Sequence, residues 1–117
     1  MRNVSRRTTS SELSQERGRK LCPAEATLIV IGGRWKVPIL YHLLAATRRF
    51  SELRRDLDGV TQKMLAQQLR ELERDGIVNR KVYPQVPPKV EYSLTMQGKT
   101  LKPVIEAMCK WGKARGR

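Results

Sequence analysis

The stretch that decides the fold is residues 50–94, which read FSELRRDLDGVTQKMLAQQLRELERDGIVNRKVYPQVPPKVEYSL. Apolar residues recur at helical spacing over its first eight positions, and Ser51 is placed to cap a short helix. Gly59 supplies the backbone freedom that a tight turn needs. Thr61 then caps a second helix that reaches about Asp75. A short helix, a tight turn and a capped helix in this order predict a helix-turn-helix.

The residues after this helix carry a strand signal. Gly76 fits the position just beyond a helix end, and Ile77 can fold back onto Leu72 as in a Schellman motif. The runs on either side of segment 84–89 are β-branched or alternating, which is typical of strands. Segment 84–89 contains three prolines, so it cannot be helical and predicts a stiff hairpin tip. A hairpin directly after a helix-turn-helix predicts a winged helix.

The flanking segments predict further helices. Pro23 fits the first turn of a helix that reaches about Ile31. A second helix over about 35–46 is apolar almost all round, so we expect it to be central and buried. Thr95 is placed to cap a last helix, which Pro103 should kink or split. The fold class expected is mainly α with a small β-hairpin, as a winged helix-turn-helix.

Composition points to a polyanionic partner. The 117 residues include 24 Lys and Arg against 11 Asp and Glu, a formal net charge of +13. Counterion release from phosphates favours binding by such a chain, so we expect double-stranded DNA rather than a membrane as the partner. No apolar run approaches the roughly 20 residues of a membrane span, and we expect a cytoplasmic, nucleoid-associated protein. The expected division is a flexible basic tail over 1–20, a DNA-binding domain over 21–113 and a basic end over 114–117.

Catalytic chemistry is poorly represented. The chain has one histidine, His42, two cysteines and no glycine-rich phosphate loop. The cysteines lack the close Cys or His partners that a zinc site requires. We therefore expect neither an enzyme nor a metal site nor a cofactor.

The second helix of the predicted helix-turn-helix has two contrasting faces. At 100° per residue, three leucines gather on one side, while Lys, Gln and Arg gather on the other. Arg and Lys can donate to guanine, and Gln can pair with adenine. The candidates for DNA binding are Thr61, Gln62, Lys63, Gln67, Arg70 and Arg74 on the helix, and Arg80, Lys81 and Lys89 on the wing. An ordinary solvated face remains the alternative, and a sequence-nonspecific basic nucleic-acid-binding protein is the alternative function.

With these motifs the chain resembles the HxlR family, a MarR-like group of winged-helix transcriptional regulators of bacteria and some archaea. The resemblance covers about residues 22–111 and implies a homodimer, built on the first and last helices, that binds a pseudo-palindromic operator. The matching segments are Cys22-Pro23, 31–35 (IGGRW), 49–54 (RFSELR), 63–65 (KML), 69–76 (LRELERDG) and 82–95 (VYPQVPPKVEYSLT).

The last helix independently favours a dimer, because it carries more apolar surface than a hairpin could cover. Packing of this stripe wholly within the monomer is the alternative. The expected interface residues are Leu28, Leu101, Ile105, Met108 and Trp111.

Two routes to regulation are considered, and the resemblance implies the first. Some HxlR-type regulators sense oxidants or electrophiles through a cysteine at the position of Cys22. Here Cys22 is expected at a helix N-terminus near Arg19 and Lys20, which would stabilise a thiolate. A buried structural role is the alternative for a lone cysteine, and it is the role expected for Cys109. A small-molecule effector between the last helix and the body is the second route, for which the sequence indicates no residues.

Overall fold

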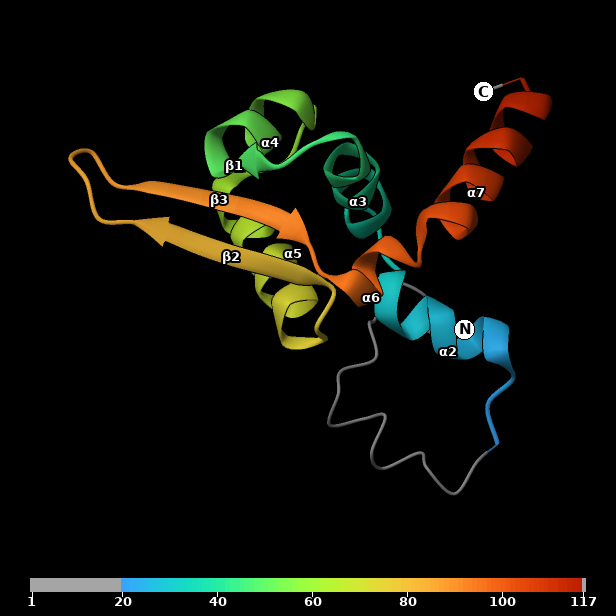
Figure 1. Cartoon of the computed structure of the whole chain (residues 1–117). Coiled ribbons are helices and arrows are strands. Elements are labelled where there is room, and N and C mark those ends of the chain that lie inside the picture. The colour runs from blue at the N-terminus through green and yellow to red at the C-terminus, as the bar shows by residue number, and fades with distance from the viewer. Residues whose placement is uncertain (1–19, 117) are drawn as a thin grey trace.

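The computed structural model describes residues 20–116 and confirms a mainly helical chain with a small antiparallel sheet. Figure 1 shows the β2–β3 hairpin and helix α7 leaving the body on opposite sides. The expected tail therefore lies outside the described residues, apart from Lys20. The elements in order are α2 (Pro23–Ile31), α3 (Lys36–Ala45), β1 (Arg48–Arg49), α4 (Phe50–Asp56), α5 (Gln62–Arg74), β2 (Val78–Tyr83), β3 (Lys89–Leu94), α6 (Met96–Lys99) and α7 (Lys102–Ala114).

Helix α5 begins and ends where local chemistry predicts. The Met64 backbone N–H donates to Thr61 Oγ1 at 3.1 Å, which confirms the expected N-cap. At the other end Gly76 has φ +76°, and Ile77 N–H donates to the Leu72 carbonyl at 2.9 Å. Because the Gly76 N–H also donates to the Glu73 carbonyl, the end of α5 is a complete Schellman motif.

Helix α4 begins two residues earlier than expected, so the prediction of Ser51 as its N-cap is wrong. Arg49 is the N-cap, and its backbone N–H donates to Glu52 Oε1 at 2.7 Å. The physical reason is that Arg49 already has extended backbone, because it pairs with Glu91 in the sheet. The chain passes directly from strand into helix.

The three strands have the order β1-β3-β2, with both pairs antiparallel. The β2–β3 register runs from Val78 opposite Leu94 to Tyr83 opposite Lys89, which confirms the predicted hairpin. The two-residue strand β1 on the other edge of β3 was not predicted. It ties the start of α4 to the wing (Figure 1).

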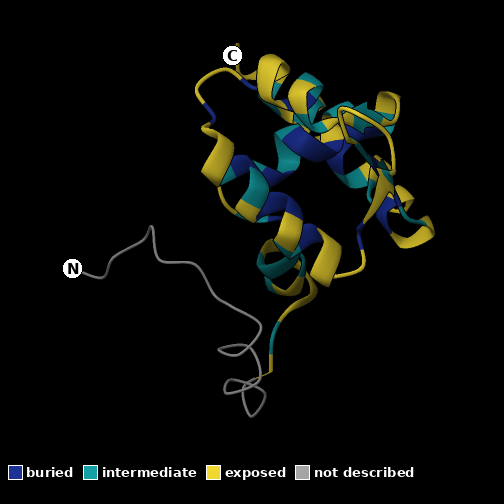
Figure 2. Cartoon of the chain, turned by 90° about the vertical axis from the view of Figure 1, so that its left-hand side faces the viewer, coloured by how far each residue is buried: buried dark blue, intermediate teal, exposed yellow. Residues whose placement is uncertain are grey.

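The core lies where α3, α4 and α5 meet the base of the sheet. Ile39 and Leu40 of α3 are fully buried, together with Leu53 of α4 and Leu65 of α5. Figure 2 shows buried stretches on several helices, with exposed stretches around them. Helix α3 is central as expected, although its residue Tyr41 is 55% exposed.

The last helical segment divides in two. Thr95 caps α6, since the Gly98 N–H donates to Thr95 Oγ1 at 2.9 Å, and α7 begins one residue before Pro103. Helix α7 then packs against α3 through the buried Ile105. Within residues 20–116 no single helix is long and apolar enough to cross a membrane, and α2 and α3 reach that length only as a pair bent by 82°.

Candidate nucleic-acid interface

Helix α5 presents one polar face to solvent and fixes the opposite face in the core. Leu65, Leu69 and Leu72 are at most 1% exposed, so the helix cannot rotate about its axis without opening the core. The outward face is therefore set by packing. The six predicted residues of α5 and its cap are all exposed: Thr61, Gln62, Lys63, Gln67, Arg70 and Arg74.

The wing gathers two lysines around one aromatic ring. Lys81 Nζ lies 4.9 Å and Lys89 Nζ 4.3 Å from the centre of the Tyr83 ring. The Tyr83 hydroxyl donates to Glu91 Oε1 at 3.0 Å, and Lys89 Nζ lies 3.6 Å from Glu91 Oε2. Each cation–π contact at such an exposed site stabilises the arrangement by about 0.5–1 kcal/mol. The structure thus holds both predicted lysines near the hairpin tip.

Arg80, the third predicted wing residue, lies near the exposed face of α5. It is exposed on β2 opposite Tyr92, and with Arg70 it lines a hollow of about 400 Å³ between α5 and the sheet. Glu73 also lines this hollow, so its charge is mixed. The fold brings together two arginines that the sequence places on different elements.

A second hollow lies between α4 and the start of α5. It measures about 460 Å³ and is lined by Arg54, Arg55 and Gln62, together with Phe50 and Ser51. Arg54 and Arg55 are exposed. These arginines could not be distinguished from ordinary surface in the sequence, because only the fold places them beside Gln62.

An ion pair between α3 and α5 was also not predicted from the sequence. Lys36, in the first turn of α3, is only 3% exposed, and its Nζ pairs with the Glu71 carboxylate. The other carboxylate oxygen, Glu71 Oε2, accepts from Gln67 Nε2 at 3.4 Å. A lysine at the start of a helix expected to be buried was the available signal, but its partner lies 35 residues away.

Comparison with known proteins assigns the chain to a family. The HxlR-like helix-turn-helix family matches residues 30–117. The chain belongs to this family. It is 59% identical over 91 residues to the HTH-type transcriptional regulator YdeP of Bacillus subtilis, covering 78% of this chain and 71% of YdeP. The protein is thus a transcriptional regulator of the helix-turn-helix type.

Solved structures of HxlR-type and MarR-like regulators share the fold. The redox regulator HypR in its oxidised form matches with a TM-score of 0.76 and 57% identity, over 80% of this chain and 96% of HypR. The reduced form of YodB from B. subtilis matches with a TM-score of 0.68 and 39% identity, over 79% of this chain and 91% of YodB. The expected winged helix-turn-helix is confirmed.

The cysteine that the family resemblance singles out is accessible in this HxlR-type chain. Cys22 is exposed and is the N-cap of α2, so its expected place at a helix N-terminus is confirmed. Its backbone N–H donates to Glu25 Oε1 at 3.1 Å, which places a carboxylate beside it. Lys20 is exposed, whereas Arg19 lies outside the described residues. Cys109 of α7 is partly buried and packs against the core.

The predicted dimer residues divide into two groups. Leu28 is 62% exposed, Met108 45% and Trp111 68%, and Leu101 is partly buried. Ile105 is only 1% exposed, so its assignment to the interface is wrong. Ile105 lies on the side of α7 that faces α3, where it closes the monomer core.

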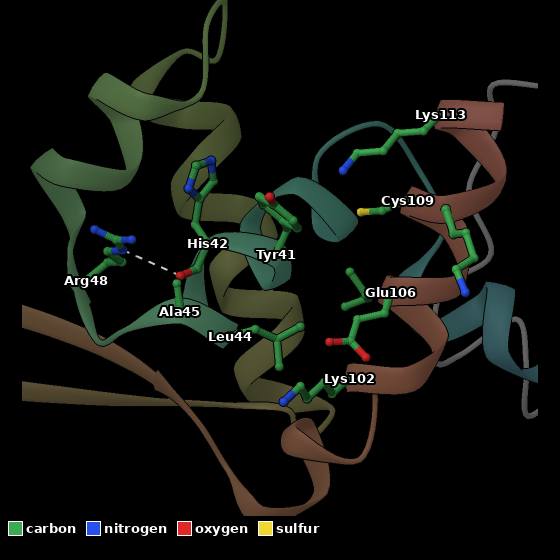
Figure 3. A pocket seen from close by; sticks show the side chains of 11 residues that line it. Tyr41, His42, Leu44, Ala45, Arg48, Lys102, Glu106, Cys109 and Lys113 are labelled. Atoms are coloured by element: carbon green, nitrogen blue, oxygen red, sulfur yellow. Dashed lines mark hydrogen bonds between the residues drawn. The ribbon is translucent and has the colours of Figure 1, made fainter. Parts of the chain in front are cut away.

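A cavity of about 670 Å³ lies between α3 and α7. Figure 3 shows Tyr41 and His42 of α3 on one side and Lys102, Cys109 and Lys113 of α7 on the other. Arg48 Nε donates to the His42 carbonyl at 3.5 Å, which holds the arginine at the rim. The lining combines four cationic side chains with one carboxylate over an apolar floor, and its residues are Tyr41, His42, Leu44, Ala45, Arg48, Lys102, Ile105, Glu106, Cys109, Lys110 and Lys113.

Proposed function

We propose that this protein is a sequence-specific double-stranded DNA-binding regulator that acts as a homodimer on a pseudo-palindromic operator in the nucleoid. The observation that carries the proposal is the exposed Lys, Gln and Arg face of α5, held outward by its buried leucine face. A helix of this kind fits the major groove, where its side chains can reach base edges. Residues 21–113 form the DNA-binding domain, with basic flanks at 1–20 and 114–117.

The wing supplies the second contact in this proposal. Lys81, Lys89 and Arg80 lie on or beside a hairpin that extends from the body next to α5. Their charges suit phosphates along the adjacent minor groove, which fix the register without reading sequence. In this proposal helix α5 provides the sequence specificity. The wing provides affinity that falls as the salt concentration rises.

The argument for a dimer is the apolar surface that the monomer exposes to water. Leu28 of α2 and Met108 and Trp111 of α7 are large apolar side chains that are each nearly half exposed or more. Pairing about a two-fold axis is the commonest way to cover such a surface. It would place the two α5 helices in successive major grooves, about one helical turn apart.

Cys22 is the proposed redox sensor. HypR and YodB, which share the fold, have structures described as oxidised and diamide-treated forms. In this chain Cys22 is exposed at the start of α2, one of the two helices assigned to the dimer. Oxidation of an accessible thiol there would alter the dimer and, with it, the spacing of the two α5 helices.

Selection of bound sequences from a random duplex pool tests this function. With reduced protein at physiological salt we expect a two-fold symmetric motif, and after hydrogen peroxide we expect the motif to be lost. The Cys22→Ser variant should keep the motif under peroxide, whereas Cys109→Ser should behave as wild type. A motif that is selected equally well with and without peroxide would contradict the redox sensor but support the sequence-specific regulator. Failure to enrich any motif would favour the nonspecific nucleic-acid binder instead.

We also propose that the cavity between α3 and α7 binds the small-molecule effector. Its mixed lining of cations over an apolar floor suits a small organic acid with an aromatic body. Fluorescence titration with 1-naphthoate should show saturable binding, weakened about fivefold in Lys102→Gln/Lys113→Gln, because two of the cations that line the cavity and would attract the carboxylate are then lost. Lys99→Gln on α6, outside the cavity, is the matched control. Equal binding by all three proteins would place the ligand elsewhere.

A further inference from the structure

The buried Lys36–Glu71 pair lies directly behind the proposed DNA-reading face. The Lys36 side chain is 3% exposed, whereas that of Glu71 is 24% exposed. An ammonium group that is taken out of water needs a charged partner held close to it. The Glu71 carboxylate is therefore fixed in position by α3, which itself forms the centre of the core.

The same carboxylate also reaches the exposed face of α5. Its Oε2 accepts from Gln67 Nε2 at 3.4 Å, while its Oε1 pairs with Lys36. Gln67 is exposed and lies one turn before Glu71 on α5. One carboxylate thus links a core lysine to an outward-facing amide.

This link orients the Gln67 amide. A glutamine side chain ends in an NH₂ donor and a carbonyl acceptor, and a free amide can present either end. A neighbouring carboxylate accepts from the NH₂ group and repels the carbonyl oxygen. Gln67 therefore keeps its Oε1 and one remaining N–H for other partners, which together match the N6 donor and N7 acceptor of adenine.

We propose that Glu71, held by Lys36, is a positioning residue that fixes the amide of Gln67 and so sets the base preference at one position of each operator half-site. The inference rests on the proposed function, since it requires α5 to read DNA. It assigns a role in specificity to two residues that need not touch DNA themselves.

A double-mutant cycle read out as base preference tests the proposal. Gln67→Ala identifies the position that Gln67 reads, by abolishing preference there. Glu71→Gln is expected to relax preference at that same position about tenfold, because a neutral amide can hydrogen-bond to either end of Gln67. In the Gln67→Ala background Glu71→Gln should have no further effect on preference. A merely structural role would instead lower affinity for every sequence equally in both backgrounds.

Asp75→Asn removes the same charge at the exposed end of α5, outside the hollow lined by Arg70 and Arg80, and is the matched control. Circular dichroism at the assay temperature checks that each variant is folded. If the wild type selects no motif, the proposed function fails. If it selects a motif but Glu71→Gln leaves every position unchanged, or Gln67→Ala alters no position, the proposed function stands and this inference is wrong.

Discussion

Replacing Arg70 with alanine is expected to weaken operator binding by between about 30-fold and about 10⁴-fold. A bidentate contact between an arginine and guanine contributes about 1–3 kcal/mol of discrimination, and a homodimer makes it twice. Arg70 is exposed on α5, while the buried leucines behind it prevent the helix from rotating to substitute another side chain. The loss should therefore be confined to the operator, with binding to unrelated duplexes reduced only slightly.

Arg74→Ala provides the comparison for Arg70→Ala. Arg74 is exposed on the last turn of α5, where a phosphate contact fits better than a base contact. Its loss should weaken binding to all sequences alike and lower the slope of log affinity against log salt by about 1 for each contact removed. Titration of fluorescent duplexes measures the affinity of both variants. If both lose the same affinity for every sequence, Arg70 does not read a base.

Replacing Glu71 with leucine is expected to lower the free energy of unfolding by about 3 kcal/mol. Removing one partner of a buried ion pair costs about 3–5 kcal/mol because the remaining charge is left in the interior. The lower end applies here, since Lys36 is 3% exposed but Glu71 is 24% exposed. Urea unfolding followed by circular dichroism measures the loss.

Adding Lys36→Met to Glu71→Leu should recover most of that stability. The double variant buries two apolar side chains in place of two charges, and such replacements are often neutral or stabilising. If this double variant is as stable as the wild type but has lost base preference, the structural role of the pair is separated from its role in orienting Gln67. A Glu71→Leu variant as stable as the wild type would show that the pair contributes little.

The helix-turn-helix and wing could be predicted because their limits are encoded locally. The cap at Thr61 and the left-handed Gly76 each act within a few residues of the helix they limit. The exposed face of α5 follows from leucine spacing in the same way. Strand β1 could not be predicted, because its two residues are extended only by pairing with β3. The same pairing is why the N-cap of α4 is Arg49 and not Ser51.

Features that depend on packing between helices far apart in the chain could not be predicted from the sequence. The partner of Lys36 is set by the packing of α3 against α5, and the apolar spacing in α7 does not reveal that Ile105 faces α3 while Trp111 faces solvent. Helical periodicity identifies an apolar stripe but not its neighbour. The cavity between α3 and α7 likewise joins residues that lie more than 50 positions apart in the sequence.

The specificity ratio of the purified protein tests the central claim most directly. Affinity for the selected operator would be compared with affinity for the same duplex with both half-sites scrambled, at one physiological salt concentration. Regulators that read bases bind their sites about 10³-fold or more tightly than unrelated DNA. We predict a ratio of at least about 10³, falling toward one in Arg70→Ala. A ratio near one for the wild type would contradict the account and leave a basic protein that binds phosphates without reading sequence.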